Sequence, residues 1–288
     1  MSLIVPPELE YDWKAARQDI VTALRGHFEN TSSERGVIGL SGGVDSSVAA
    51  YLATEALGRE NVVALFLPEA GVTPTEDMDD AERVAKQIGL EPVTIEISPA
   101  VRAFTALVPG VLLKGEDGSL RHPTGYANIK ARVRMILLYL QANISDKAQV
   151  IGTGDKSELL LGYNTKHGDH GVDLHPIGDL YKSQVRYLAK MVGLPENVWR
   201  KKPSPQLLKG QTAEGEIGAD YVTIDRVLYY RVDERYPEQR IVEELGMPEE
   251  IVHRICRMIV QSHHKRKPPP ICKIGSATIN WDWRMPVE

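Results

Sequence analysis

Residues 36–47, GVIGLSGGVDSS, join a short apolar run to a pair of glycines and then to the start of a helical pattern. The run Gly36–Leu40 is typical of a buried strand, and the apolar spacing of Val44–Leu57 predicts a helix. Because Gly42 and Gly43 lack side chains, the backbone of this turn can approach an anion closely. The N–H groups at the start of the helix would bind that anion, so the stretch predicts a phosphate-binding loop.

The alternation of apolar runs and helical patterns continues along the chain. Strands are predicted over residues 62–67, 92–97 and 149–151. Helices are predicted over residues 11–28, 75–88, 127–140, 225–234 and 248–262. Two segments rich in glycine and polar residues, 162–178 and 203–218, are predicted to be surface loops. This order is typical of an α/β protein with a doubly wound parallel sheet flanked by helices.

The composition is that of an ordinary soluble globular protein, with 42% hydrophobic and 25% charged residues and a net charge of −5 over 288 residues. Nucleic acid is therefore not the expected partner. Only Cys256 and Cys272 are present, far apart, so neither a zinc site nor a disulfide framework is predicted. No signal-peptide pattern opens the chain and no apolar stretch approaches membrane-spanning length, which predicts a cytoplasmic protein with no membrane partner.

Asp45 indicates that the loop also uses a metal ion. The hydroxyls of Ser41 and Ser46 can donate to phosphate oxygens, but a carboxylate at the same place would repel a phosphate unless a divalent cation bridged the two. Mg²⁺ is therefore predicted. A glycine turn capped by serines would also explain Ser41-Gly42-Gly43 alone. The Walker motif is absent, with 154–157 only a near miss, and 152–154 lacks the third glycine of a dinucleotide fingerprint.

The string 41–46 resembles the loop of the ATP pyrophosphatase family, in which it holds the pyrophosphate that will leave. Further motifs look like the signature of NAD synthetase: IGTGDKSE at 151–158, GYNTKHGD at 162–169, PIGDLYK at 176–182, KPSP at 202–205 and HKR at 264–266. The resemblance covers most of the chain from Gly39 to Pro270.

The resemblance implies a Rossmann-like adenine nucleotide alpha hydrolase fold in a single NAD synthetase domain over 1–288. Within it we expect an N-terminal helix at 11–30, an ATP pyrophosphatase core at 36–200, a mobile loop at 203–218 and a C-terminal helical part at 219–288. Ala213 stands in that loop where relatives often carry an acid, which weakens any claim for a catalytic carboxylate there.

The resemblance also implies roles for individual residues. ATP would be bound by Gly39, Leu40, Ser41, Gly42, Gly43, Val44, Asp45, Ser46, Thr153, Lys182 and Ser204. The metal ligands would be Asp45 and Glu158. Nicotinic acid adenine dinucleotide (deamido-NAD) would be bound by Arg132, Lys166, Asp173, His264 and Lys265. Catalytic roles would fall to Asp45, Glu158, Asp173 and Lys182, with Asp173 a candidate for capturing or deprotonating ammonium.

The implied activity is the last step of NAD biosynthesis. ATP would activate the carboxylate of deamido-NAD as an acyl-adenylate with release of pyrophosphate, and ammonia would displace AMP. The length leaves no room for the glutaminase domain that some NAD synthetases carry, so free ammonia is the expected nitrogen source. A homodimer is also implied, with the apolar stripe of 127–140 as a candidate contact.

Alternatives exist for the residues and for the activity. Arg132 could be an exposed arginine and Lys182 a solvated lysine, and the basic run 263–267 could be a solvated tail or a nuclear signal. His167, His170 and His175 could suggest a metal cluster, but they lack cysteine or aligned carboxylate partners and are interpreted as polar loop residues. A tRNA thiolase would need cysteines in the active region and a basic surface. A non-catalytic adenine-nucleotide sensor could share the fold and the loop.

Overall fold

The computed structural model describes residues 5–110, 120–204, 207 and 212–279. Its centre is a parallel sheet in the order β3-β2-β1-β4. The strands are β1 (Arg35–Gly39), β2 (Val62–Phe66), β3 (Val93–Thr94) and β4 (Ala148–Ile151). Val37 of β1 is paired with Val63 on one side and Val150 on the other. The predicted α/β fold with a parallel sheet is confirmed.

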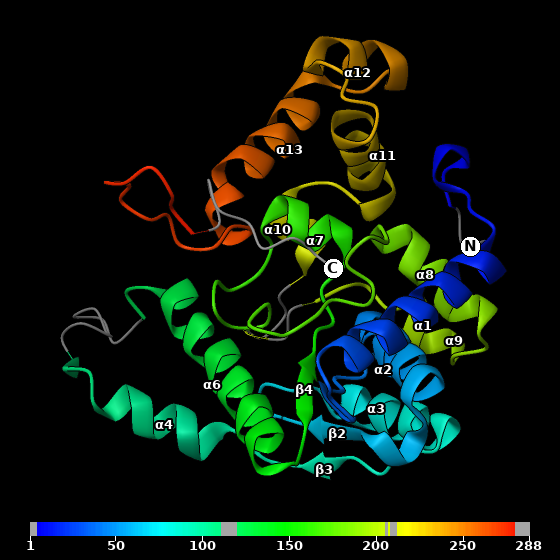
Figure 1. Ribbon diagram of the computed structural model, residues 1–288. Coiled ribbons are helices and arrows are strands. Elements are labelled where there is room, and N and C mark those ends of the chain that lie inside the picture. Colours follow the sequence, from blue (N-terminus) through cyan, green and yellow to red (C-terminus); the bar gives the residue numbers. More distant parts are fainter. Residues whose placement is uncertain (1–4, 111–119, 205–206, 208–211, 280–288) are drawn as a thin grey trace.

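Helices cover both faces of the sheet (Figure 1). Alternate residues of β1 point to opposite faces, so Ile38 joins one hydrophobic cluster and Val37 the other. The Ile38 face is covered by α1 (Trp13–Asn30), α2 (Val44–Leu57), α3 (Thr75–Ile88), α8 (Lys182–Met191) and α9 (Glu196–Arg200). The Val37 face is covered by α4 (Ser98–Ala106) and α6 (Pro123–Ile144). Burial on both faces explains why β1 is a continuous apolar run.

A separate helical layer lies beyond the carboxyl ends of the strands (Figure 1). Its helices are α7 (Lys156–Leu161), α10 (Ala213–Ile217), α11 (Tyr221–Val232), α12 (Glu238–Leu245) and α13 (Glu249–Gln261). They share a hydrophobic cluster that includes Leu161 of α7 and Leu9, which lies in the 3-10 turn Pro7–Leu9. Two further 3-10 turns lie elsewhere in the chain: Arg59–Asn61 precedes β2, and His263–Lys265 follows α13.

Several predicted boundaries differ from the structure. The strand predicted at 92–97 is only Val93–Thr94, because Pro92 has no N–H to donate and the chain turns into α4 from Ser98. The helix predicted from 127 begins at Pro123, and the one predicted from 225 begins at Tyr221, where Asp220 accepts a hydrogen bond from the Thr223 N–H. The predicted loop 203–218 contains the helix α10, and its residues 205–206 and 208–211 lie outside the described residues.

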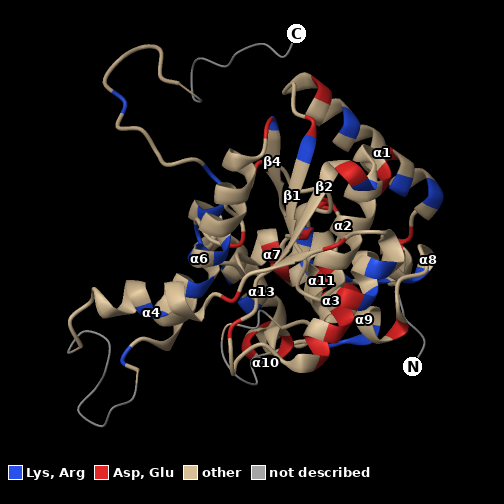
Figure 2. Ribbon diagram, turned by 90° about the horizontal axis from the view of Figure 1, so that it is seen from below, with Lys and Arg blue, Asp and Glu red and all other residues tan. Residues whose placement is uncertain are grey.

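Charged residues are mixed in sign along much of the chain. Helix α1 carries both basic and acidic residues, whereas α4 carries one basic residue and is otherwise uncharged (Figure 2). Within the described residues, no helix is both long and apolar enough to cross a membrane.

Candidate active site

The glycine turn after β1 has one position that only glycine can occupy. Gly42 has a φ of 77°, and a Cβ there would lie 2.1 Å from the backbone oxygen of Asp77 in α3. The turn is held by Ser46, whose hydroxyl accepts from the Ser41 N–H at 3.1 Å and donates to the Gly43 carbonyl at 3.1 Å. No side chain caps the start of α2. The first N–H groups of a 14-residue helix are therefore available to an anion, as the sequence predicts for a phosphate loop.

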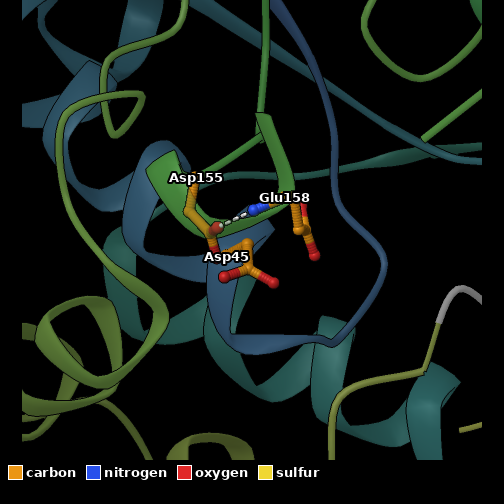
Figure 3. A group of neighbouring side chains, drawn as sticks. All are labelled: Asp45, Asp155 and Glu158. Carbon is orange, nitrogen blue, oxygen red and sulfur yellow. Dashed lines mark hydrogen bonds between the residues drawn. The ribbon is translucent and has the colours of Figure 1, made fainter. Parts of the chain in front are cut away.

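Three carboxylates meet beside this turn (Figure 3). Asp45 lies in the first turn of α2, Asp155 is the N-cap residue of α7, and Glu158 lies in the first turn of α7. One oxygen from each lies within 4.8 Å of the others. The Asp155 side chain is fully buried, whereas those of Asp45 and Glu158 are about one-fifth exposed. The predicted metal pair, Asp45 and Glu158, is thus brought together with a third acid.

Lys182, the first residue of α8, lies inside this triangle. Its Nζ is 2.7 Å from Asp45 Oδ2, 2.7 Å from Asp155 Oδ2 and 2.8 Å from Glu158 Oε1. The side chain is fully buried and does not line the cleft described below. Lys182 was predicted to bind ATP and to act in catalysis. The structure places its ammonium group behind the carboxylates, within a helix.

The ionisation of the cluster reflects burial and mutual repulsion. Burial raises the pKa of Asp155 to about 6, against the attraction of the Lys182 ammonium. Burial likewise raises the pKa of Glu158 well above its usual range. For Lys182, burial lowers the pKa, but the three carboxylates outweigh that effect and hold the pKa well above its ordinary value. Three acids around one ammonium leave a net negative site, which would favour a further cation.

The donor set fits Mg²⁺. Carboxylate oxygens are the hard ligands that Mg²⁺ takes alongside substrate phosphates. Asp45 Oδ1 is buried and makes no hydrogen bond to the described part of the chain, so one ligand atom lacks a partner. The phosphate loop and the carboxylates converge on the same start of α2. The residues present would therefore hold a magnesium ion between the protein and a bound phosphate.

A cleft of about 540 Å³ opens at the carboxyl ends of the strands. Ligands of open α/β sheets bind at this edge. Many predicted residues line it: Gly39, Leu40, Ser41, Gly43, Val44, Asp45, Ser46, Thr153, Glu158, Ser204 and Lys265. Gly42, Lys182, Arg132, Lys166, Asp173 and His264 do not.

The residues predicted to bind the second substrate divide into two groups. Arg132 on α6 donates to the Lys166 carbonyl at 3.1 Å, and Lys166 Nζ is 3.4 Å from His264 Nδ1. These three residues therefore lie together, and each is next in sequence to a residue that lines the cleft. Lys265 lines the cleft, but its Nζ donates at 2.6 Å to the carbonyls of both Gly162 and Asn164.

Asp173 is placed away from the cleft lining. Its Oδ2 accepts from the Val150 N–H at 2.7 Å and its Oδ1 from the Tyr139 hydroxyl at 3.0 Å. Both oxygens therefore stabilise the junction of β4 and α6, and these contacts give no support to a role in capturing ammonium. Asp169, four residues earlier, does line the cleft.

Asp155 is the main residue that the sequence interpretation missed. It falls within the string 151–158 that resembles NAD synthetase and within the near-miss Walker string 154–157, but no role was predicted for it. A usable signal was present, because an acid directly after a buried parallel strand and before a helix falls at the edge of the sheet where ligands bind.

His170 and His175 pack against one another and against the backbone of the strand-following loop. Their ring centroids are 5.0 Å apart, and a Cβ added to Gly154 would lie 2.4 Å from His170 Nε2. Burial lowers the pKa of His170 to about 3 and that of His175 to about 4. Both rings are therefore neutral near pH 7 and fill space behind the loop at 152–154.

Comparison with known proteins relates this site to one family. A family model described as NAD synthase matches residues 16–269. The chain is 46% identical over 280 residues to the NH(3)-dependent NAD(+) synthetase of Saccharolobus solfataricus, a match that covers 96% of each chain. It is similar to the structure of NMN synthetase from Francisella tularensis, with a TM-score of 0.77 and 34% identity over 92% of this chain and 100% of that one. It is also similar to the structure of the NH3-dependent NAD synthetase of Campylobacter jejuni, with a TM-score of 0.73 and 30% identity over 92% of this chain and 100% of that one.

These matches cover the phosphate loop, the carboxylate triangle and Lys182, as well as the helical layer through α13. Likeness of this extent in both sequence and structure shows more than a shared fold. The chain belongs to the NAD synthase family.

Proposed function

We propose that the chain is an ammonia-dependent NAD synthase, a ligase that amidates deamido-NAD in the last step of NAD biosynthesis. ATP is the co-substrate, and the products are NAD, AMP and pyrophosphate. The observation that carries the proposal is the carboxylate triangle of Asp45, Asp155 and Glu158 at the start of α2, directly beside a glycine turn built to receive phosphate. The identity to NH(3)-dependent NAD(+) synthetases supports the choice of reaction.

The start of α2 and the serines of its turn would hold the pyrophosphate part of ATP. Asp45 and Glu158, with Asp155 behind them, would hold Mg²⁺, whose charge stabilises the departing pyrophosphate when bound. The protein would otherwise act by alignment of the nicotinate carboxylate with the α-phosphate. No side-chain nucleophile is required, since the acyl group is activated by the nucleotide itself.

Lys182 would serve as a fixed counter-charge. Its ammonium contacts all three carboxylates, so it holds them together before the substrates bind. It also keeps a positive charge within the site that receives the leaving pyrophosphate. Ser204, Thr153 and Lys265 line the same cleft and remain candidates for contacts with the two nucleotides.

A homodimer is proposed from the exposed apolar side chains of α6 and α4. Ile136, Leu140 and Ile144 on α6 are 46%, 53% and 70% exposed, and Phe104 of the adjoining α4 is 46% exposed. Large exposed apolar patches mark association sites. The two cysteines of the chain are free, which suits a reducing compartment, and we propose a cytoplasmic location.

A mononucleotide substrate is the second candidate, because the similar structure from Francisella tularensis is an NMN synthetase. The higher identity over nearly the whole chain is to NH(3)-dependent NAD(+) synthetases, which favours the dinucleotide. Family membership favours amide formation over the transfer of sulfur to tRNA.

One assay separates these functions. Purified protein is mixed with ATP, Mg²⁺ and ammonium, and pyrophosphate and the amide product are measured with deamido-NAD or nicotinic acid mononucleotide as acceptor. We expect efficient turnover with deamido-NAD and ammonium, and much less with glutamine or the mononucleotide. A nucleotide sensor would release no pyrophosphate, and that result would overturn the proposal.

A further inference from the structure

Two carboxylates of the helical layer each bridge the same pair of helices. The first is Asp225, in the middle of α11 and completely buried. Its Oδ1 accepts from the Ser157 hydroxyl at 2.5 Å, and its Oδ2 accepts from the Ser183 N–H at 2.8 Å. Ser157 lies in the first turn of α7 and Ser183 in the first turn of α8. One side chain of α11 thus joins the starts of two other helices.

The second carboxylate is Asp233, the residue that ends α11. Its Oδ1 accepts from Lys156 Nζ at 2.8 Å, and its Oδ2 accepts a short hydrogen bond from the Tyr181 hydroxyl. Lys156 is the first residue of α7, and Tyr181 is the N-cap residue of α8. The Lys156 ammonium also lies over the Tyr181 ring, 4.6 Å from its centroid. The two bridges therefore join the same two helix starts.

These helix starts carry the charged groups of the candidate active site. Ser157 immediately precedes Glu158, and Ser183 immediately follows Lys182. The Ser157 hydroxyl also accepts from the Lys182 N–H at 3.0 Å. The path from Asp225 to the backbone of Lys182 is therefore a continuous series of hydrogen bonds. The 2.8 Å separation of Lys182 Nζ from Glu158 Oε1 depends on how α7 is placed relative to α8.

We propose that Asp225 is a positioning residue that, together with Asp233, fixes α7 against α8 and so sets the geometry in which Glu158, paired with Lys182, holds Mg²⁺. The proposal rests on the proposed function for its catalytic consequence. A six-residue helix such as α7 has little stability alone, so the orientation of Glu158 must come from outside α7. The hydrogen bonds made by Asp225 and Asp233 of α11 would fix that orientation, so the helical layer would help to shape the active site.

The decisive variant is Asp225→Asn. An amide of the same shape has one accepting oxygen and one donating NH₂ group, so Ser157 can stay bonded only if its hydroxyl turns round and accepts, and the negative charge of the bridge is lost. Val227→Ala is the matched control, because Val227 is equally buried in α11 but belongs to the hydrophobic cluster of the helical layer. Both variants perturb α11, and only the first changes the hydrogen bonds and the charge of the bridge.

We expect Asp225→Asn to lower kcat and to raise the half-saturating Mg²⁺ concentration, each on the order of 10-fold, while KM for deamido-NAD stays near the wild-type value. Val227→Ala, at an equal or larger loss of Tm, should leave both quantities unchanged. Ser157→Ala should raise the half-saturating Mg²⁺ concentration as well, to a smaller extent. This variant tests the same proposal if Asp225→Asn fails to fold. Asp233→Asn should add to the effect of Asp225→Asn.

Binding of Mn²⁺ in the presence of a non-hydrolysable ATP analogue, followed by electron paramagnetic resonance, gives a second reading that needs no turnover. Asp225→Asn should bind Mn²⁺ more weakly than Val227→Ala. Equal Mn²⁺ binding by the two variants, with equal loss of Tm, would show that Asp225 only stabilises the fold and would overturn the proposal. If the wild-type protein made no NAD yet bound Mn²⁺, the proposed function would be wrong. The comparison of Mn²⁺ binding by Asp225→Asn and Val227→Ala would still test the positioning role.

Discussion

At the scale of single residues, Asp155 combines two tasks that are usually separate. Its Oδ1 caps α7 by accepting from the Glu158 N–H at 2.8 Å, and its Oδ2 is 2.7 Å from the Lys182 ammonium. Capping orients Glu158, and the charge holds Lys182. A fully buried carboxylate is tolerated here because both oxygens have such partners, and because a metal site gains from the extra negative charge.

Asp155→Asn separates these tasks, because asparagine caps helices about as well as aspartate but carries no charge. We expect the fold to survive and the half-saturating Mg²⁺ concentration to rise by about 10–100-fold. The matched control is Asp12→Asn, since Asp12 caps α1 through the N–H groups of Lys14 and Ala15 and makes no contact with the cleft. Unchanged Mg²⁺ dependence in Asp155→Asn would show that only Asp45 and Glu158 matter to the metal.

The two buried histidines predict an acid-sensitive fold. Burial depresses the pKa of His170 to about 3 and of His175 to about 4, from an ordinary value of 6.5. Above pH 6.5 both rings are neutral in the folded and unfolded chain. Below pH 6.5 the two imidazoles bind protons in the unfolded chain but stay neutral in the folded chain. The free energy of unfolding therefore decreases as pH falls toward 4.

The free energy of unfolding should decrease by up to about 1.4 kcal/mol per pH unit for each histidine over that range. Urea unfolding between pH 7 and pH 5 measures the slope. His170→Gln cannot titrate, so between pH 7 and pH 5 it should lose less stability than the wild type, by up to about 1.4 kcal/mol per pH unit, even if it is less stable throughout. A variant with the wild-type slope would contradict the assignment.

At the scale of elements, the conformation of the phosphate turn depends on one residue, Gly42. The positive φ of Gly42 and the 2.1 Å approach of the Asp77 oxygen both exclude a side chain. Gly43, its neighbour, has a φ of −82°, and an added Cβ would be 3.3 Å from the flexible Ser41 hydroxyl. The two glycines that look alike in the sequence thus have different requirements.

Gly42→Ala should lower the free energy of unfolding by about 1–3 kcal/mol, because alanine is strained at this φ and pushes α3 away. It should also raise KM for ATP, since the turn must shift. Gly43→Ala is the matched control and should unfold within about 1 kcal/mol of the wild type. Thermal and urea unfolding with ATP titrations check both. Equal stability of the two variants would refute the requirement at Gly42.

Much of the fold was predictable at this scale and some of it was not. The periodicities of β1 and α2 are long enough to be recognised, as is the alternation that leads to a parallel sheet. Helices such as α7 and α9, of six and five residues, were not predicted because they are too short to show a period. Asp45 and Glu158 were predicted as partners from motifs. The contacts of Asp173 and Asp225 were not predictable, since they depend on how a long loop and a distant helix fold back onto β4, α7 and α8.

At the scale of the whole molecule, the exposed apolar stripe on α6 and α4 is the surface that the proposed dimer would bury. Leu140→Glu would place a charge in its centre, so this variant should be monomeric by light scattering where the wild type is dimeric. Val260→Glu is the control, because Val260 is 71% exposed and belongs to α13, outside the stripe. A monomeric wild type at micromolar concentration would exclude the dimer.

The ammonium of Lys182 has one more consequence, for how the protein can be handled. Because an internal cation already neutralises part of the carboxylate charge, the chain should not need metal in order to fold. A chelator such as EDTA should stop turnover reversibly while leaving the melting curve nearly unchanged. Lys182→Met should reverse this pattern, so that Mg²⁺ raises Tm far more than in the wild type. With Lys182 in place, the wild-type protein should therefore stay folded in a cell starved of magnesium and resume synthesis when the ion returned.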